Sequence, residues 1–140
     1  MIYHFNMHKE EDGFWAECVE LPGCKTQAET YSELIEFCKE SLNIYLEEPK
    51  DSKVVFPLPN ESLDNDSTLL RIDVEPEIAL AVLLRYNRSN LRLTQKQVAE
   101  MLGMKNIYSY QRLEKRSNPT LTIIKRIHSI FPEINLEKIV

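Results

Sequence analysis

The period of the hydrophobic pattern changes at Glu75–Pro76, a little past the middle of this chain of 140 residues. Before that point, apart from one helical stretch, apolar and polar residues alternate with the two-residue period of half-buried strands. After it, apolar residues recur every three or four positions, which is the period of amphipathic helices. The change predicts an α+β domain over residues 1–74 and an all-α domain over residues 75–140.

The first domain is predicted to be a small antiparallel sheet covered on one face by a single helix. The polar turn Lys9–Gly13 lies between two alternating stretches, which indicates a β-hairpin. Leu21–Gly23 then ends the second strand, because its proline cannot donate a hydrogen bond to the ladder. The expected elements are strands over residues 1–7, 14–19, 24–28 and 68–74 and a helix, capped by Thr30, over Tyr31–Leu46.

The second domain is predicted to be a set of short helices with clear boundary signals. Thr94 and Gln97 have the spacing of a capping box, in which two side chains satisfy free backbone amides at the start of a helix. Gly103 suits the left-handed position that ends many helices. The sequence further predicts a first helix ending near Asn87 and a later helix whose core-facing residues are Leu121, Ile124, Ile127 and His128.

Charge is divided as sharply as the hydrophobic pattern. Residues 1–90 contain 8 Lys and Arg against 18 Asp and Glu, a net charge of −10, whereas residues 91–140 contain 9 against 4, a net charge of +5. The two halves together give the −5 of the whole chain. Opposite charges predict separate partners, because each sign attracts a different class of surface.

Cysteine usage indicates a reducing compartment. Cys18, Cys24 and Cys38 leave one cysteine unpaired in any disulfide scheme. The first residues lack the basic start and continuous apolar run of a signal peptide, and no window is apolar enough for a membrane span. We therefore expect a cytoplasmic location and no membrane association. His4 and His8 share a strand face, but no further ligand completes a zinc site, so we expect no metal and no cofactor.

Residues 92–130 contain the outline of a helix-turn-helix. Thr94, Gln95, Ala99, Leu102 and Gly103 give the pattern T-Q-x-x-x-A-x-x-L-G, which resembles the phage-repressor or XRE family of DNA-binding domains. The stretches RLE at 112–114 and NPTL at 118–121 also resemble that family's continuation. Gly103 and Glu114 are eleven positions apart, one more than the family's commonest spacing, which predicts a longer turn before the second helix.

The resemblance implies that the second helix enters the major groove of operator DNA. We expect base contacts from polar residues on its exposed face, since Gln and Asn pair with adenine and Arg with guanine. Residues at the start of the first helix and in the turn would instead hold phosphates. The base-reading set is Asn106, Tyr108, Ser109, Gln111 and Arg112, and the phosphate-binding set is Gln95, Lys96 and Lys105. The alternative is a helical module that binds protein, with Arg112 only solvated.

The first half of the chain carries a second resemblance. The stretch FWAECVELPGCKTQAET, followed by an amphipathic helix and VVFPLP, resembles the HicB antitoxin family. The resemblance implies a truncated ribonuclease H-like sheet fused to a carboxy-terminal DNA-binding domain. It also implies a HicA-like toxin as partner, a small basic ribonuclease that cuts messenger RNA with a histidine. The matching residues are Phe14, Ala16, Leu21, Pro22, Gly23, Cys24, Thr26, Ala28 and Thr30.

An acidic surface suits such a partner, because a protein that binds RNA is itself electropositive. Acidic residues gather on or near the predicted hairpin, and Trp15 among them would anchor the interface, as aromatic residues often do. Two alternatives stay open: that Trp15 belongs to the core, and that the acidic face is only solvated. The expected toxin-binding set is Glu10, Glu11, Asp12, Trp15, Glu17 and Glu20.

Together the resemblances predict an antitoxin that neutralises a HicA-like toxin and represses its own operon, acting as a homodimer or higher homo-oligomer on two DNA half-sites. Such a protein would not itself be an enzyme. One alternative is a metal-dependent nuclease that uses Asp12, Glu17 and Glu20, although Glu17 and Glu20 are expected on opposite faces of a strand. Another is a repressor whose acidic half senses a small molecule, although that half has no glycine-rich phosphate loop.

Overall fold

The computed structural model describes residues 1–49 and 52–140, and the chain divides into two compact units. Unit 1 comprises Met1–Leu46 and Pro57–Val74, and unit 2 comprises Glu47–Phe56 and Glu75–Val140. The boundary after Val74 lies where the hydrophobic period changes. The segment 47–56 differs from the expectation, because it belongs with the helices: the Ser52 carbonyl accepts a hydrogen bond of 2.6 Å from Arg85 Nη1.

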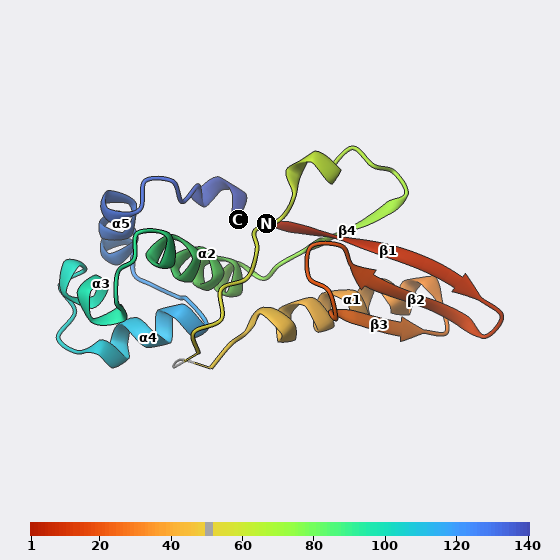
Figure 1. Cartoon of the computed structure of the whole chain (residues 1–140), viewed down its shortest axis with the longest axis horizontal. Coiled ribbons are helices and arrows are strands. Elements are labelled where there is room, and N and C mark those ends of the chain that lie inside the picture. The colour runs from red at the N-terminus through yellow and green to blue at the C-terminus, as the bar shows by residue number, and fades with distance from the viewer. Residues whose placement is uncertain (50–51) are drawn as a thin grey trace. The chain divides into compact units, whose positions relative to one another are not determined.

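Unit 1 is built on a four-stranded antiparallel sheet in the order β3-β2-β1-β4 (Figure 1). The long strand β1 pairs with β2 on one side and with β4 on the other, and β2 pairs with β3. The expected small antiparallel sheet is therefore confirmed, with strand ends shifted by a few residues. The strands are β1 (Ile2–Glu10), β2 (Gly13–Cys18), β3 (Lys25–Ala28) and β4 (Leu69–Asp73).

Helix α1 (Tyr31–Leu46) covers one face of this sheet (Figure 1) and has the predicted bounds. Its start is capped as expected, since Thr30 Oγ1 accepts a hydrogen bond of 3.2 Å from the Glu33 amide. Among the described residues α1 is the longest helix, and no helix there is long and apolar enough to cross a membrane. The buried apolar side chains of the sheet and of α1 are Tyr3, Phe5, Ala16, Cys18, Ile72, Leu34, Cys38, Leu42 and Leu46.

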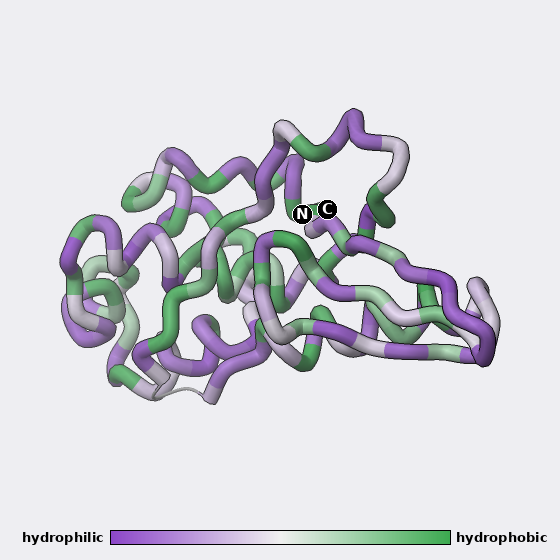
Figure 2. The backbone as a smooth tube through the Cα atoms, turned by 45° about the vertical axis from the view of Figure 1, so that its right-hand side comes forward, coloured by the Kyte–Doolittle hydropathy of each residue, from purple (hydrophilic) through white to green (hydrophobic). Residues whose placement is uncertain are grey.

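The alternation along the strands gives the sheet two chemically different faces. Figure 2 shows hydrophilic and hydrophobic residues interleaved along it. Tyr3 and Phe5 of β1 point toward the core, so His4 and His8 lie on the opposite face, here called the outer face. Trp15 of β2 is paired with His8 and lies on that face too.

Unit 2 is all-helical, and several sequence signals in it are confirmed. Thr94 and Gln97 form the predicted capping box, and Gly103 has a positive φ of 70°. A Cβ atom at Gly103 would also lie 3.0 Å from Arg126 Nη1, so both backbone conformation and space favour glycine. The helices are α2 (Pro76–Asn90), α3 (Gln95–Met101), α4 (Ile107–Lys115) and α5 (Leu121–Ile130), followed by a short 3-10 turn (Leu136–Lys138).

Three expectations for these helices are wrong. Helix α2 continues to Asn90 and does not end near Asn87, and the chain turns at Arg92, which has a positive φ of 55°. Leu121 is 84% exposed and His128 is also exposed, although both were expected in the core. The buried stripe of α5 passes through Ile127, and at 100° per residue both positions lie about 100° or more away from that line.

A buried ion pair joins α2 to α4. Arg88 donates two hydrogen bonds to the Glu114 carboxylate, from Nε at 2.6 Å and from Nη2 at 3.0 Å. Arg85 Nη2 donates to the Glu114 carbonyl at 3.0 Å, and the Glu114 side chain is fully buried. Burial alone would lower the pKa of Arg88, but its hydrogen bonds to Glu114 and the carboxylate charge raise it above the ordinary value. The Arg88 guanidinium therefore stays charged inside unit 2.

Replacing Glu114 tests this pair. In Glu114→Gln the guanidinium groups of Arg85 and Arg88 lose their negative partner, so we expect the free energy of unfolding of unit 2 to fall by about 3–5 kcal/mol. Chemical denaturation followed by helical circular dichroism would measure it. The exposed Glu100→Gln on α3 is the matched control, with an expected change under about 0.5 kcal/mol. Equal stability of the two variants would contradict the role of the pair.

Candidate functional site

The end of the β1–β2 hairpin is strongly acidic. Glu10 ends β1, Glu11 and Asp12 form the turn, and all three side chains are exposed. Gly13 follows with φ of 144°, and a Cβ atom there would lie 2.4 Å from the Ala28 carbonyl oxygen. This close approach brings the acidic turn against the end of β3.

Trp15 lies beside this turn on the outer face and is half-buried. Its ring stacks on His8 with the centroids 4.1 Å apart, and its Nε1 donates a hydrogen bond of 3.1 Å to Glu10 Oε1. The alternative that Trp15 belongs to the core is therefore wrong, because Ala16 and not Trp15 takes the inward position of β2. The indole is an aromatic surface held in place by its neighbours.

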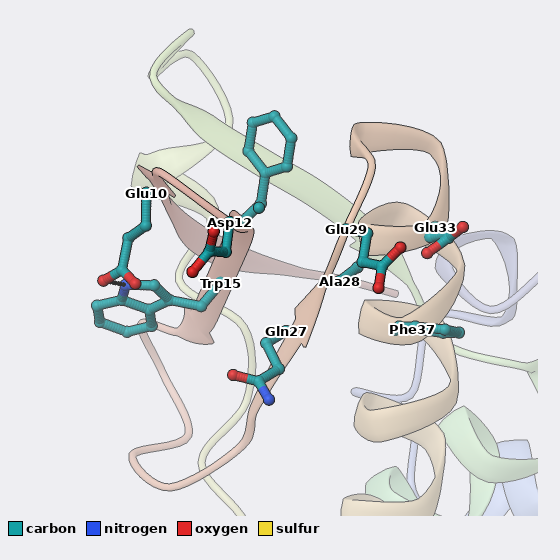
Figure 3. Close-up of a pocket in the computed structure, with 10 residues that line it drawn as sticks. Glu10, Asp12, Trp15, Gln27, Ala28, Glu29, Glu33 and Phe37 are labelled. Carbon is teal, nitrogen blue, oxygen red and sulfur yellow. Dashed lines mark hydrogen bonds between the residues drawn. The ribbon is translucent and has the colours of Figure 1, made fainter.

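A hollow of about 470 Å³ lies between the hairpin turn and the start of α1 (Figure 3). Figure 3 shows Glu10 and Trp15 on one side of it and Glu29, Glu33 and Phe37 on the other. Four of its lining residues are acidic and three are aromatic, and among the described residues that line it none is basic. The hollow is thus suited to a cationic side chain. Its lining residues are Glu10, Asp12, Gly13, Phe14, Trp15, Gln27, Ala28, Glu29, Glu33 and Phe37.

Sequence reasoning missed Glu29 and Glu33 as members of this acidic site. They follow β3 and open α1, and only the pairing of Phe14 with Ala28 brings them to the hairpin. A correct prediction of the β2–β3 register would have placed four carboxylates around one hollow. They are those of Glu10, Asp12, Glu29 and Glu33.

Glu10, Asp12 and Trp15 of the predicted toxin-binding set line the hollow, whereas Glu11 in the turn, Glu17 and Glu20 do not. Glu17 Oε2 accepts a hydrogen bond of 2.9 Å from the Gly23 amide. The Glu20 side chain is only 5% exposed and lies 2.7 Å from His4 Nδ1, so the fold does not present it to a partner. Asp12, Glu17 and Glu20 are therefore not brought together as a nuclease site would need. In the described ranges, no group of three or more His, Cys, Asp and Glu residues is arranged to hold a metal ion.

In unit 2, helices α3 and α4 follow one another across the turn at Gly103. Tyr108 and Arg112 of α4 are exposed, while Tyr110 is buried, so the polar face of α4 is accessible. Lys96 and Lys105 are exposed as well. Lys115, which was not predicted as a site residue, is exposed and falls on the face of Tyr108 and Arg112 because the three are spaced four and three apart.

Four of the predicted DNA-binding residues form two hydrogen-bonded pairs, Asn106 with Ser109 and Gln111 with Gln95. Asn106 caps α4, and its Oδ1 accepts hydrogen bonds from the Ser109 amide at 3.0 Å and from the Ser109 hydroxyl at 3.3 Å. This cap occupies Asn106 Oδ1 and the Ser109 hydroxyl, two of the groups that were expected to read bases. Gln111 Nε2 donates to Gln95 Oε1 at 3.0 Å, and Gln95 Nε2 donates to Glu114 at 3.2 Å. The two glutamines are therefore fixed to the buried ion pair.

Fold and surface chemistry together define the class of this chain: a protein with an acidic α+β unit joined to an all-helical unit of opposite charge. No family model matches the chain. A curated relative, a UPF0150 protein of Archaeoglobus fulgidus, is 46% identical over 52 residues, which cover 36% of this chain and 75% of the relative. The chain belongs to the UPF0150 family, which is HicB-like.

Proposed function

We propose that this protein is a HicB-like antitoxin with one binding task for each unit. Unit 1 would bind a small basic HicA-like ribonuclease and cover its RNA-binding surface, and unit 2 would bind operator DNA and repress the toxin–antitoxin genes. The chain itself would make or break no covalent bond. The observation that carries the proposal is the opposite charge of the units: 4 Lys and Arg against 13 Asp and Glu in unit 1, a net of −9, and 13 against 9 in unit 2, a net of +4.

The hollow beside Trp15 supports the toxin-binding role. A Lys or Arg side chain of the toxin entering it would meet the carboxylates of Glu10, Asp12 and Glu33 and the indole face of Trp15. A cation over an indole ring contributes roughly 0.5–2 kcal/mol, with the larger value when water is excluded. The surrounding acidic turn would steer a basic partner toward this point before contact.

The exposed face of α4 supports the DNA-binding role. Arg112 can pair with guanine, and Gln111, held by Gln95, can pair with adenine. Lys96, Lys105 and Lys115 would contact phosphates and set the register of the helix on the duplex. Because two reading helices must reach half-sites about one helical turn apart, the DNA-bound form would be at least a dimer.

Removing Arg112 tests the DNA-binding role. We expect Arg112→Ala to weaken binding to DNA from upstream of the protein's own gene by about 1–3 kcal/mol, measured by fluorescence anisotropy, because a bidentate base contact is lost. Lys39→Ala, an exposed position on α1 in unit 1, removes the same charge and should bind DNA as the wild type does. Toxin inhibition should be unchanged in both variants. Equal loss of DNA binding and toxin inhibition in Arg112→Ala would contradict two separate sites.

Reversing the acidic turn tests the toxin-binding role. The triple variant Glu10→Lys, Glu11→Lys, Asp12→Lys should associate with a HicA-like toxin at least about tenfold more slowly at low salt, with a smaller difference at high salt. Stopped-flow fluorescence of Trp15, the single tryptophan of this chain, would follow the reaction.

A control variant separates the hairpin from net charge alone. The triple variant Glu36→Lys, Glu40→Lys, Glu61→Lys reverses three exposed acidic residues of unit 1 that lie outside the hollow. Its overall charge equals that of the hairpin variant, so only the location differs. If the control slows association as much as the hairpin variant does, the acidic turn is not the docking surface.

A further inference from the structure

His4 is clamped between two carboxylates inside unit 1. Its Nδ1 lies 2.7 Å from Glu20 Oε2 and its Nε2 lies 2.7 Å from Asp64 Oδ1. The His4 side chain is fully buried, and that of Asp64 is 38% exposed. The three residues come from β1, from the turn after β2 and from the segment Pro57–Thr68, which connects to β4. The cluster therefore joins three parts of the chain that are distant in sequence.

The two short contacts of His4 fix the protonation state of its ring. A neutral imidazole has one N–H donor and one bare nitrogen, whereas an ionised carboxylate only accepts. A bare nitrogen facing a carboxylate oxygen at 2.7 Å would be a contact between two acceptors. Glu20 already accepts hydrogen bonds of 3.0 Å from the amides of His4 and Asn60, as a carboxylate does, and Arg71 Nη2 lies 3.8 Å from Asp64. Both protons therefore belong on the His4 ring.

The Pro57–Thr68 segment depends on this ring. Asp64 contacts His4 directly, and the Asn60 amide donates to the same Glu20 oxygen that faces His4 Nδ1. The third tie, from the Tyr3 hydroxyl to the Pro57 carbonyl at 2.8 Å, lies at the start of the segment. When the ring loses one proton, one of its two carboxylate contacts must break. Asp64 is the more exposed partner and can take up water instead.

We propose that His4 is a pH-operated latch, whose charged ring holds the Pro57–Thr68 segment against β1 through Asp64 and releases it on losing a proton. The charged and titratable groups around the ring are Glu20 and Cys18 from β2 and the turn after it, Asp64 and Asp66 from the segment, and Arg71 from β4. Negative groups outnumber the one cation, so the ring proton is held strongly.

The direction of the switch follows from the pKa of the His4 ring. Burial opposes the charged form, but the hydrogen bonds and charges of Glu20 and Asp64 outweigh it and raise the pKa of His4 above its ordinary value of about 6.5. The folded protein thus keeps the proton at a pH where the unfolded chain has lost it. The latch is closed, and stabilises unit 1, on the acid side; it opens as the pH rises through the raised value.

Hydrogen exchange combined with NMR titration tests the latch on the full chain. We expect the His4 ring to titrate above about pH 6.5, and amides of residues 60–68 to exchange roughly tenfold faster or more at about pH 9 than at about pH 6, after correction for the intrinsic rate. His8→Gln, four residues along the same strand, should leave both results unchanged. A His4 ring that titrates at or below about pH 6.5, or equal protection at both pH values, would overturn the proposal.

Two substitutions of Asp64 give opposite outcomes and leave the His4–Glu20 contact in place. Asp64→Ala should expose residues 60–68 to exchange at both pH values, while the amides of β1 and β2 stay protected. Asp64→Asn should stay closed at both, because an amide can donate to the bare nitrogen of a neutral ring or accept from a charged one. Wild-type pH dependence in Asp64→Asn would show that the switch lies elsewhere.

Discussion

The two-residue alternation of side chains in β1 and β2 is the constraint on which unit 1 depends. It turns Tyr3 and Phe5 toward α1 and thereby commits His4, His8 and Trp15 to the outer face. One end of that face, at His4, is covered by the Pro57–Thr68 segment, and the other end, at Trp15, stays accessible. The His4 latch and the accessible surface of Trp15 thus lie at opposite ends of the same sheet face, and one strand register places both.

Unit 2 depends on a different interaction, the buried ion pair between Arg88 and Glu114. The Glu114 carboxylate accepts hydrogen bonds from Arg88 of α2 and from Gln95 of α3. Gln111 then donates to Gln95. One carboxylate in the interior therefore sets the positions of three helices and the orientation of a polar side chain at the surface. The cost of burying that charge is offset by its hydrogen bonds, and the geometry that results is specific.

Local signals in the sequence predicted local structure well. The hairpin, the bounds of α1 and the capping box at Thr94 all follow from residues within a few positions of one another. The UPF0150 relative, matched over 52 residues, agrees with the resemblance to the HicB family but does not test a fused DNA-binding domain. The misses are long-range. Nothing near Glu20 in sequence indicates that His4 would bind it, and nothing near Glu29 indicates the hollow. His128 was misplaced because a helix rotation of 100° separates a core position from an exposed one.

The order of the strands has a consequence for synthesis of the chain. β1 lies in the interior of the sheet, but its second neighbour, β4, is the last strand to be made, some sixty residues later. While the ribosome translates the intervening segment, β1 has an unpaired edge that other nascent chains can bind. The hairpin and α1 can assemble early, but the second edge of β1 is paired only when Leu69–Asp73 emerges. A chain cut short before that point would therefore have an unpaired, aggregation-prone strand edge.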